Sequence, residues 1–166
     1  MNKLRHFTFL VSGGGGNMKF VHLGIIKNYI KDAELSVIAD RDCPALEYAK
    51  THGIQNHKIN YNLNKTEELN PTLDKIEPDI IITNWHKIID KHTVEKNSGK
   101  LINLHYSLLP AFSGLIGTEP IERAYKQGCK FIGPTCHLVE EKVDAGKILT
   151  QSGFRADIPI KKAVRK

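Results

Sequence analysis

Two short segments in the second half of the chain carry side chains that suit acyl transfer. Asn103 and His105 lie two positions apart in a run typical of a strand, so both side chains project from the same face where a loop begins. With a carboxylate from a distant loop, such as Asp144, they would supply a donor for a developing oxyanion and a group that moves protons near neutral pH. Spacing alone leaves a plainer alternative open, because a histidine at a strand end is more often structural and Asp-Ala-Gly is a common turn.

A loop of four consecutive glycines lies between Ser12 and Asn17. Its backbone N–H groups are open to an anion, and the following helix begins with its positive end, so phosphate is the natural ligand. The loop lacks the Lys-Ser/Thr of a P-loop, and the third glycine of the dinucleotide fingerprint falls on Met18 or Lys19. Two alternatives stay open: a nicotinamide cofactor whose ribose is held by Asp40, and a tight turn with Asn17 as the helix cap.

Alternating strands and helices must position these residues. Apolar patterning predicts strands at 6–11, 35–39, 54–60, 79–83, 101–104, 136–139 and 147–152. It predicts helices at 18–29, 44–52, 63–76, 90–96 and 119–127, with a long loop over 105–117. This alternation predicts an α/β fold of three layers, Rossmann-like, with a mostly parallel sheet and helices on both faces. Ligands of such folds bind at the carboxyl ends of the strands.

Length, charge and composition favour one domain without a membrane span. The chain has 166 residues, 40% of them apolar, and a formal net charge of +6. The last ten residues hold four basic and one acidic side chain, which is half of that charge, so we expect a domain over 1–156 and a basic, solvated tail over 157–166. No basic stripe or aromatic platform indicates nucleic acid. The absence of a secretory signal and the three cysteines predict the cytoplasm.

Five motifs resemble those of the folate-dependent formyltransferases. They are Ser-Gly-Gly-Gly-Gly-Asn at 12–17, Asn-Leu-His-Tyr-Ser-Leu-Leu-Pro at 103–110, Phe-Ser-Gly-Leu at 112–115, Gly-Pro-Thr-Cys-His at 133–137 and Val-Asp-Ala-Gly at 143–146. Within that superfamily, the chain is most similar to the branch that acts on glycinamide ribonucleotide. The resemblance implies the formyltransferase fold, 10-formyltetrahydrofolate as co-substrate, a small-molecule amine as acceptor, and no metal.

The resemblance also implies roles for individual residues. Asn103 would steady the tetrahedral oxyanion, His105 would donate to it as an imidazolium, and Asp144 would pair with His105 and help to remove the amine proton. The folate pocket is implied at an apolar turn and at the loop before the aspartate, with Ile88, Ile89, Val94, Glu140, Glu141 and Val143. Core packing is the alternative for the three residues of the turn. Acceptor contacts are implied for Gly14, Gly15, Gly16, Asn17 and Tyr106.

Three departures from the family pattern bear on the acceptor. Gly16 stands where a serine is usual, so a hydroxyl donor to the phosphate is missing. Tyr106 replaces a small residue or proline, and its ring would narrow the site or stack on a sugar or base. The chain continues only a little beyond Gln151, so some acceptor contacts would be absent, made differently, or supplied by another subunit of a homodimer. The alternatives to glycinamide ribonucleotide are an amino sugar on a nucleotide, hydrolysis of formyltetrahydrofolate, and an idle folate- or phosphate-binding module.

Overall fold

The computed structural model describes residues 4–85 and 87–163, and the chain divides into two compact units. The first unit ends at Leu101 and the second begins at Ile102. His86 and residues 164–166, the last of the predicted tail, are outside the described residues. The assignment of one domain to 1–156 stays a prediction.

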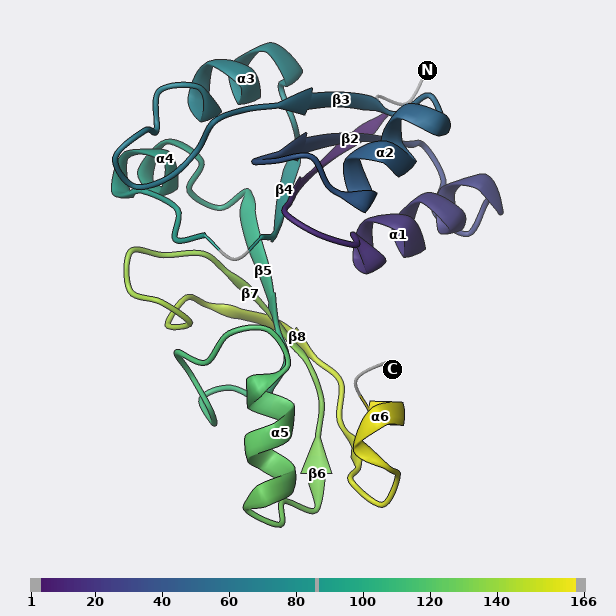
Figure 1. Cartoon of the computed structure of the whole chain (residues 1–166), viewed down its shortest axis with the longest axis vertical. Coiled ribbons are helices and arrows are strands. Elements are labelled where there is room, and N and C mark those ends of the chain that lie inside the picture. Colours follow the sequence, from purple (N-terminus) through teal and green to yellow (C-terminus); the bar gives the residue numbers. More distant parts are fainter. Residues whose placement is uncertain (1–3, 86, 164–166) are drawn as a thin grey trace. The chain divides into compact units, whose positions relative to one another are not determined.

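The first unit contains a parallel sheet whose strand ends are level. Its strands are β1 (Arg5–Val11), β2 (Ala33–Ala39), β3 (Gln55–Lys58) and β4 (Ile80–Asn84), in the order β3-β2-β1-β4 (Figure 1). All three strand pairs are parallel, and Val11 lies opposite both Ala39 and Asn84. The loops that follow β1, β2 and β4 therefore start at one edge of the sheet, where α/β proteins bind ligands.

The helices of this unit mostly follow the predicted pattern. They are α1 (Gly16–Ile26), α2 (Pro44–Thr51), α3 (Leu69–Ile76) and α4 (Lys91–Lys96). A proline at the first position of α2 presets the helical φ, and the carboxylate of Asp90 caps α4 by accepting the N–H of Thr93 at 2.9 Å. The prediction that α3 begins at residue 63 was wrong. Asn62 and Lys65 instead exchange two backbone hydrogen bonds, of 2.9 and 3.1 Å, in a separate turn.

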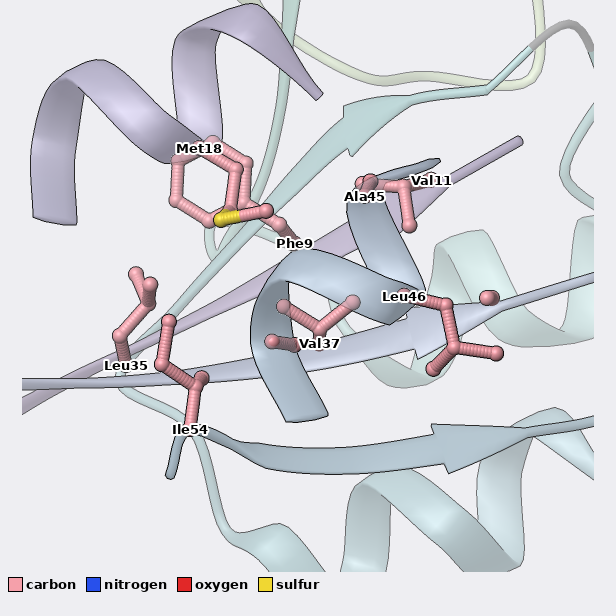
Figure 2. Close-up of a cluster of buried hydrophobic side chains, with 10 residues drawn as sticks. Phe9, Val11, Met18, Leu35, Val37, Ala45, Leu46 and Ile54 are labelled. Atoms are coloured by element: carbon pink, nitrogen blue, oxygen red, sulfur yellow. The ribbon is translucent and has the colours of Figure 1, made fainter. Parts of the chain in front are cut away.

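Side chains on both faces of the strands are buried. Phe9 of β1 and Val37 of β2 pack with Met18 of α1 and Leu46 of α2 in one cluster (Figure 2). Leu10 points to the other face of β1 and is also completely buried. Burying such a side chain contributes about 1.5–3 kcal/mol, so both covered faces stabilise the sheet. This is the burial expected of a parallel sheet between two helical layers.

The second unit is built around antiparallel strands. Its elements are β5 (Leu101–His105), α5 (Glu119–Lys126), β6 (Phe131–Ile132), β7 (Thr135–Leu138), β8 (Ile148–Gln151), β9 (Phe154–Arg155) and α6 (Ile160–Ala163). β7 pairs with β5 and β8, and β6 pairs with β9. Ala163 of α6 is buried with Ile121 and Ala124 of α5, so part of the segment expected to be a solvated tail is packed. Patterning missed β6, β9 and α6 because each has four residues or fewer.

Candidate active site

Four polar side chains come together in the second unit. Asn103 and His105 lie on β5, His137 lies on β7, and Asp144 lies in the turn before β8. The antiparallel register places Asn103 opposite His137. The side chains of His105, His137 and Asp144 are only 5%, 3% and 5% exposed. The structure thus brings together the three residues singled out from the sequence and adds a second histidine.

His105 is held between two oxygen atoms. Its Nδ1 lies 3.4 Å from Oδ2 of Asp144, and its Nε2 lies 3.1 Å from the backbone oxygen of Phe112. A backbone oxygen and an ionised carboxylate only accept hydrogen bonds. The imidazolium form of His105 satisfies both contacts, whereas a neutral ring satisfies one.

The carboxylate of Asp144 is held by His105 and by the backbone, and His137 lies beside it. The residue adopts a left-handed backbone conformation with φ 54°, which aspartate and asparagine tolerate better than most residues. Besides the contact with His105, Oδ2 accepts the backbone N–H of Gly114 at 2.8 Å, and Oδ1 lies 3.5 Å from Nε2 of His137. The carboxylate therefore joins the loop after β5 to the turn before β8.

His137 is the residue that sequence analysis left without a role. Its Nδ1 lies 2.8 Å from the backbone oxygen of Leu138 and carries the hydrogen in that contact. In the neutral ring Nε2 then has a free lone pair, which accepts from Nδ2 of Asn103 at 3.2 Å. This contact orients the amide of Asn103 and leaves its second N–H for another acceptor. His137 belongs to the quoted motif at 133–137, but its position opposite Asn103 depends on strand register, which spacing does not give.

Polar contacts with β7 and β8 hold the loop that follows β5. The buried hydroxyl of Thr135 donates to the backbone oxygen of Ser107 at 2.6 Å and accepts the N–H of Leu109 at 3.0 Å. The side-chain amide of Gln151 donates to the same hydroxyl at 2.9 Å and to the oxygen of Leu109 at 3.0 Å. A buried hydroxyl with all of its partners in place fixes the start of this loop beside the cluster.

In the first unit, the glycine loop caps α1 with backbone. Gly15 is the N-cap with φ 66°, and a Cβ there would lie 2.6 Å from Cβ of Ala45, so only glycine fits. The alternative of Asn17 as the cap was wrong, because the helix already begins at residue 16 and Asn17 instead contacts Oδ1 of Asn84 at 3.4 Å. A Cβ would meet no atom within 4 Å at Gly13, Gly14 and Gly16.

Asp40, the candidate ribose ligand, is engaged by two cations. Its carboxylate is 1% exposed and lies 2.7 Å from Nη2 of Arg41 and 3.5 Å from Nζ of Lys87. Burial by itself would raise the pKa of Asp40, but the hydrogen bond and charge of Arg41, with Lys87, outweigh it and lower that pKa. The carboxylate of Asp40 thus pairs with Arg41 and Lys87 of the chain itself, where the alternative would have it bind a ribose.

The apolar turn has both a buried and an exposed part. Ile89 and Val94 are 9% and 7% exposed, which also agrees with the alternative of core packing, whereas Ile88 is 59% exposed. The hydroxyl of Tyr61 donates to Oδ2 of Asp90 at 3.0 Å and holds the turn at its end. Burial raises the pKa of this tyrosine, so its hydroxyl stays protonated. Of these three candidate folate contacts, only Ile88 has an exposed side chain.

The remaining candidates lie in the second unit. Glu140, Glu141 and Val143 are exposed and immediately precede Asp144. Tyr106 is half-buried and packs against the cluster of α5 and α6. Across residues 4–85 and 87–163, His, Cys, Asp and Glu side chains form no group of three that would hold a metal ion. No helix in the same ranges is long and apolar enough to span a membrane.

Comparisons with known proteins show which family the chain belongs to. Residues 5–162 match the family model described as formyl transferase, so the chain belongs to the formyl transferase family. The phosphoribosylglycinamide formyltransferase of Arabidopsis thaliana chloroplasts is 32% identical over 163 residues, covering 91% of this chain and 55% of that protein. The formyltetrahydrofolate deformylase of Haemophilus influenzae is 30% identical over 140 residues, covering 80% and 49%. The chain thus spans about half the length of these two relatives.

Solved structures confirm the fold class. The phosphoribosylglycinamide formyltransferase of Anaplasma phagocytophilum superposes with a TM-score of 0.84 at 26% identity, covering 98% of this chain and 79% of that one. Glycinamide ribonucleotide transformylase 1 of Symbiobacterium toebii gives 0.88 at 25% identity, covering 99% and 81%. The expected Rossmann-like α/β fold with a mostly parallel sheet is therefore correct.

Proposed function

We propose that the chain transfers a formyl group from 10-formyltetrahydrofolate to the primary amine of a phosphorylated small molecule, with glycinamide ribonucleotide as the acceptor. The observation that carries this proposal is the buried contact of 3.4 Å between His105 and Asp144, beside Asn103. Family membership supports the same chemistry. When a neutral amine attacks a formyl group, a negative charge develops on oxygen and a positive charge on nitrogen. An amide donor and an imidazole stabilise the first, and a carboxylate stabilises the second.

The first step forms a C–N bond. The lone pair of the amine attacks the formyl carbon, the C=O electron pair moves to oxygen, and the tetrahedral intermediate carries O⁻ and N⁺. The free N–H of Asn103 donates to the oxyanion, and the positive charge of His105 stabilises it. A buried position strengthens both effects, because little water screens them.

The second step moves a proton and breaks the bond to the donor. Asp144, in contact with His105, accepts the proton of the ammonium nitrogen. As C=O re-forms, the bond between the formyl carbon and N10 of the folate breaks, and N10 receives that proton. The products are the N-formyl amine and tetrahydrofolate, and Asp144 and His105 return to their starting protonation states.

Substrate contacts are assigned in the same proposal. Gly14, Gly15, Gly16 and Asn17 bind the phosphate of the acceptor, supported by the open surface of the loop at the start of α1. Tyr106 borders the acceptor. The folate contacts are Ile88, Ile89, Val94, Glu140, Glu141 and Val143. A homodimer, a cytoplasmic location and an amino sugar on a nucleotide as a different acceptor belong to the same set of proposals.

Water as the acceptor is the second candidate. The observation that favours it is the 30% identity to a formyltetrahydrofolate deformylase over 80% of this chain. The same cluster would then activate water, and the products would be formate and tetrahydrofolate.

A single assay with several readouts separates these functions. The chain is incubated with 10-formyltetrahydrofolate and a panel of amines that includes glycinamide ribonucleotide and nucleotide-linked amino sugars. Mass spectrometry then detects formylated amine, and a coupled assay detects formate. Formylated amine that disappears with His105→Ala supports the transferase, and formate without formylated amine supports hydrolysis. Folate binding with neither product would replace both by an idle binding module.

A further inference from the structure

Helix α1 carries apolar side chains on two opposite faces. On the inner face, Met18 is completely buried in the core cluster (Figure 2). Val21 and Ile25 pack against the same cluster. A surface helix of a globular protein normally has polar side chains on the face opposite its core contacts. The outer face of α1 departs from this rule.

Large apolar side chains line that outer face. Phe20, Leu23 and Ile26 are 78%, 46% and 61% exposed, and their spacing of three residues places them along one side of the helix. Tyr29, in the turn after the helix, is 82% exposed. We call these four residues the α1 patch. Single exposed apolar residues need no explanation, but a continuous row of them marks an interaction surface.

The turn after α1 is folded back onto the helix. The N–H groups of Tyr29 and Ile30 both donate to the oxygen of Gly24, at 2.8 and 3.1 Å. A Cβ at Gly24 would lie 3.0 Å from Cδ1 of Ile30, so the missing side chain lets the turn approach this closely. Asn28 supports the reversal with a left-handed φ of 59°. Tyr29 is therefore held at the end of the helix by ordered backbone contacts.

The charged side chains of α1 and of the turn after it are all basic. Residues 16–31 contain Lys19, Lys27 and Lys31 and no aspartate or glutamate, and the first acidic residue after them is Asp32. Two copies of this face packed together would oppose lysine with lysine, which disfavours self-association. Acidic side chains around an apolar ridge would instead complement both the lysines and the exposed row.

We propose that the α1 patch binds an amphipathic helix of a partner protein, whose apolar ridge is bordered by aspartate and glutamate. Aromatic residues such as Phe20 and Tyr29 are enriched at the energetic centres of protein interfaces. Four side chains cover only part of the roughly 800 Å² per partner that a standard interface buries, so the complex is transient. The proposal does not depend on the proposed enzymatic function.

Peptide probes test the chemistry of the partner. The first probe is a helical peptide of about 18 residues with a leucine ridge bordered by glutamate, the second has lysine in place of glutamate, and the third has serine in place of the ridge. Binding to the full chain is followed by fluorescence anisotropy. We expect the glutamate peptide to bind at least about tenfold tighter than either control, and more weakly as salt rises.

Two variants and one matched control locate the binding. Phe20→Gln and Ile26→Gln should each raise the Kd of the glutamate peptide about fivefold or more. Both substitutions remove apolar contact and keep a good helix former. Leu63→Gln removes a side chain that is 59% exposed outside α1 and should leave binding unchanged. Equal binding of the glutamate and lysine peptides, or loss with Leu63→Gln alone, would overturn the proposal.

Two further measurements test other occupants. Sedimentation of the chain at rising concentration detects self-association, and flotation with phosphatidylcholine–phosphatidylserine vesicles detects lipid binding. We expect Phe20→Gln to leave the sedimentation behaviour of the chain unchanged at every concentration. We expect neither protein to float with the vesicles. Self-association that Phe20→Gln abolishes would show that the α1 patch binds a second copy of the chain. Vesicle binding that Phe20→Gln abolishes would show that it binds a membrane. Either result would overturn the proposal of an acidic helical partner.

Discussion

At the scale of single residues, the contact between Asp144 and His105 carries the proposed chemistry. Asp144→Asn keeps the size of the side chain and its tolerance of a left-handed φ but removes the charge, so the variant should fold and bind folate. We expect kcat/KM to fall by at least about 10²-fold, the low end for a positioned proton-transfer group. His105→Ala should lose as much or more, and the double variant far less than the product of the two losses. Multiplicative losses would show that the two residues act independently.

A second prediction concerns His137, which we place as a positioning residue for Asn103. His137→Leu leaves the amide of Asn103 and the oxygen of Leu138 without their partner. Removing an oxyanion donor lowers kcat by about 10²–10³-fold, so a donor that is present but no longer oriented should lose about 5- to 150-fold. The folate KM should change little, whereas a purely structural role would lower the thermal midpoint without this selective loss. His57→Leu, on half-buried β3, serves as the control.

At the scale of elements, the glycine loop is both a helix start and a proposed phosphate site. Gly15→Val would place a β-branched residue at φ 66° and a Cβ 2.6 Å from that of Ala45. We expect a loss of roughly 1–3 kcal/mol of stability and the largest rise in acceptor KM among loop variants. Gly14→Ala meets no atom within 4 Å and should leave the thermal midpoint unchanged. If the folded Gly15→Val protein keeps its acceptor KM, the loop does not bind the phosphate and serves only as a turn.

The contact between α1 and α2 should make stability depend on pH. Nδ1 of His22 lies 3.0 Å from the hydroxyl of Tyr48, and its ring meets that of His52 edge-on at 5.6 Å. Burial, and then the charge of His52, lower the pKa of His22 below its ordinary value of 6.5. Below pH 6.5 the unfolded chain therefore binds more protons than the folded chain. The stability that neutral His22 contributes above that pH is lost as the pH falls.

The thermal midpoint at several pH values checks this sign. The wild-type midpoint should fall relative to that of His22→Gln between pH about 7 and 5, so that the difference between the proteins narrows or reverses in acid. Parallel curves for the two proteins would contradict the prediction. Groups that do not interact with His22 cancel in this difference, whereas the interaction between His22 and His52 is part of the measured effect.

At the scale of the whole molecule, ligand binding must stabilise the folded chain by mass action. A folate ligand at 100 times its Kd should add about 2.7 kcal/mol, which appears as a higher thermal midpoint. Ile88→Asp should shrink this shift by placing a charge against the ligand, and it should fold normally since Ile88 is 59% exposed. Leu63→Asp, equally exposed, is the matched control. Ile89 is unsuitable for this test because its burial would make the same substitution unfold the chain.

Much of the fold follows from local patterns. The strands at 5–11, 33–39 and 80–84 and the helix at 44–51 agree with the predicted ranges to within two residues, because alternation and helical spacing record which side chains face a core. The late start of α3 and the short elements after residue 130 were missed. A turn made by two backbone hydrogen bonds and strands of two residues leave no periodic signal.

The sequence by itself determined the motifs: an amide and an imidazole two residues apart on a strand, an aspartate in an Asp-Ala-Gly turn, and a glycine loop before a helix. Only the tertiary structure decided how these side chains meet. Antiparallel register places His137 opposite Asn103, and the left-handed turn at Asp144 brings its carboxylate to His105, 39 positions earlier in the sequence. Residue types and spacing record chemistry and local conformation, whereas contacts across the sheet depend on strand pairing and loop closure, which no local pattern specifies.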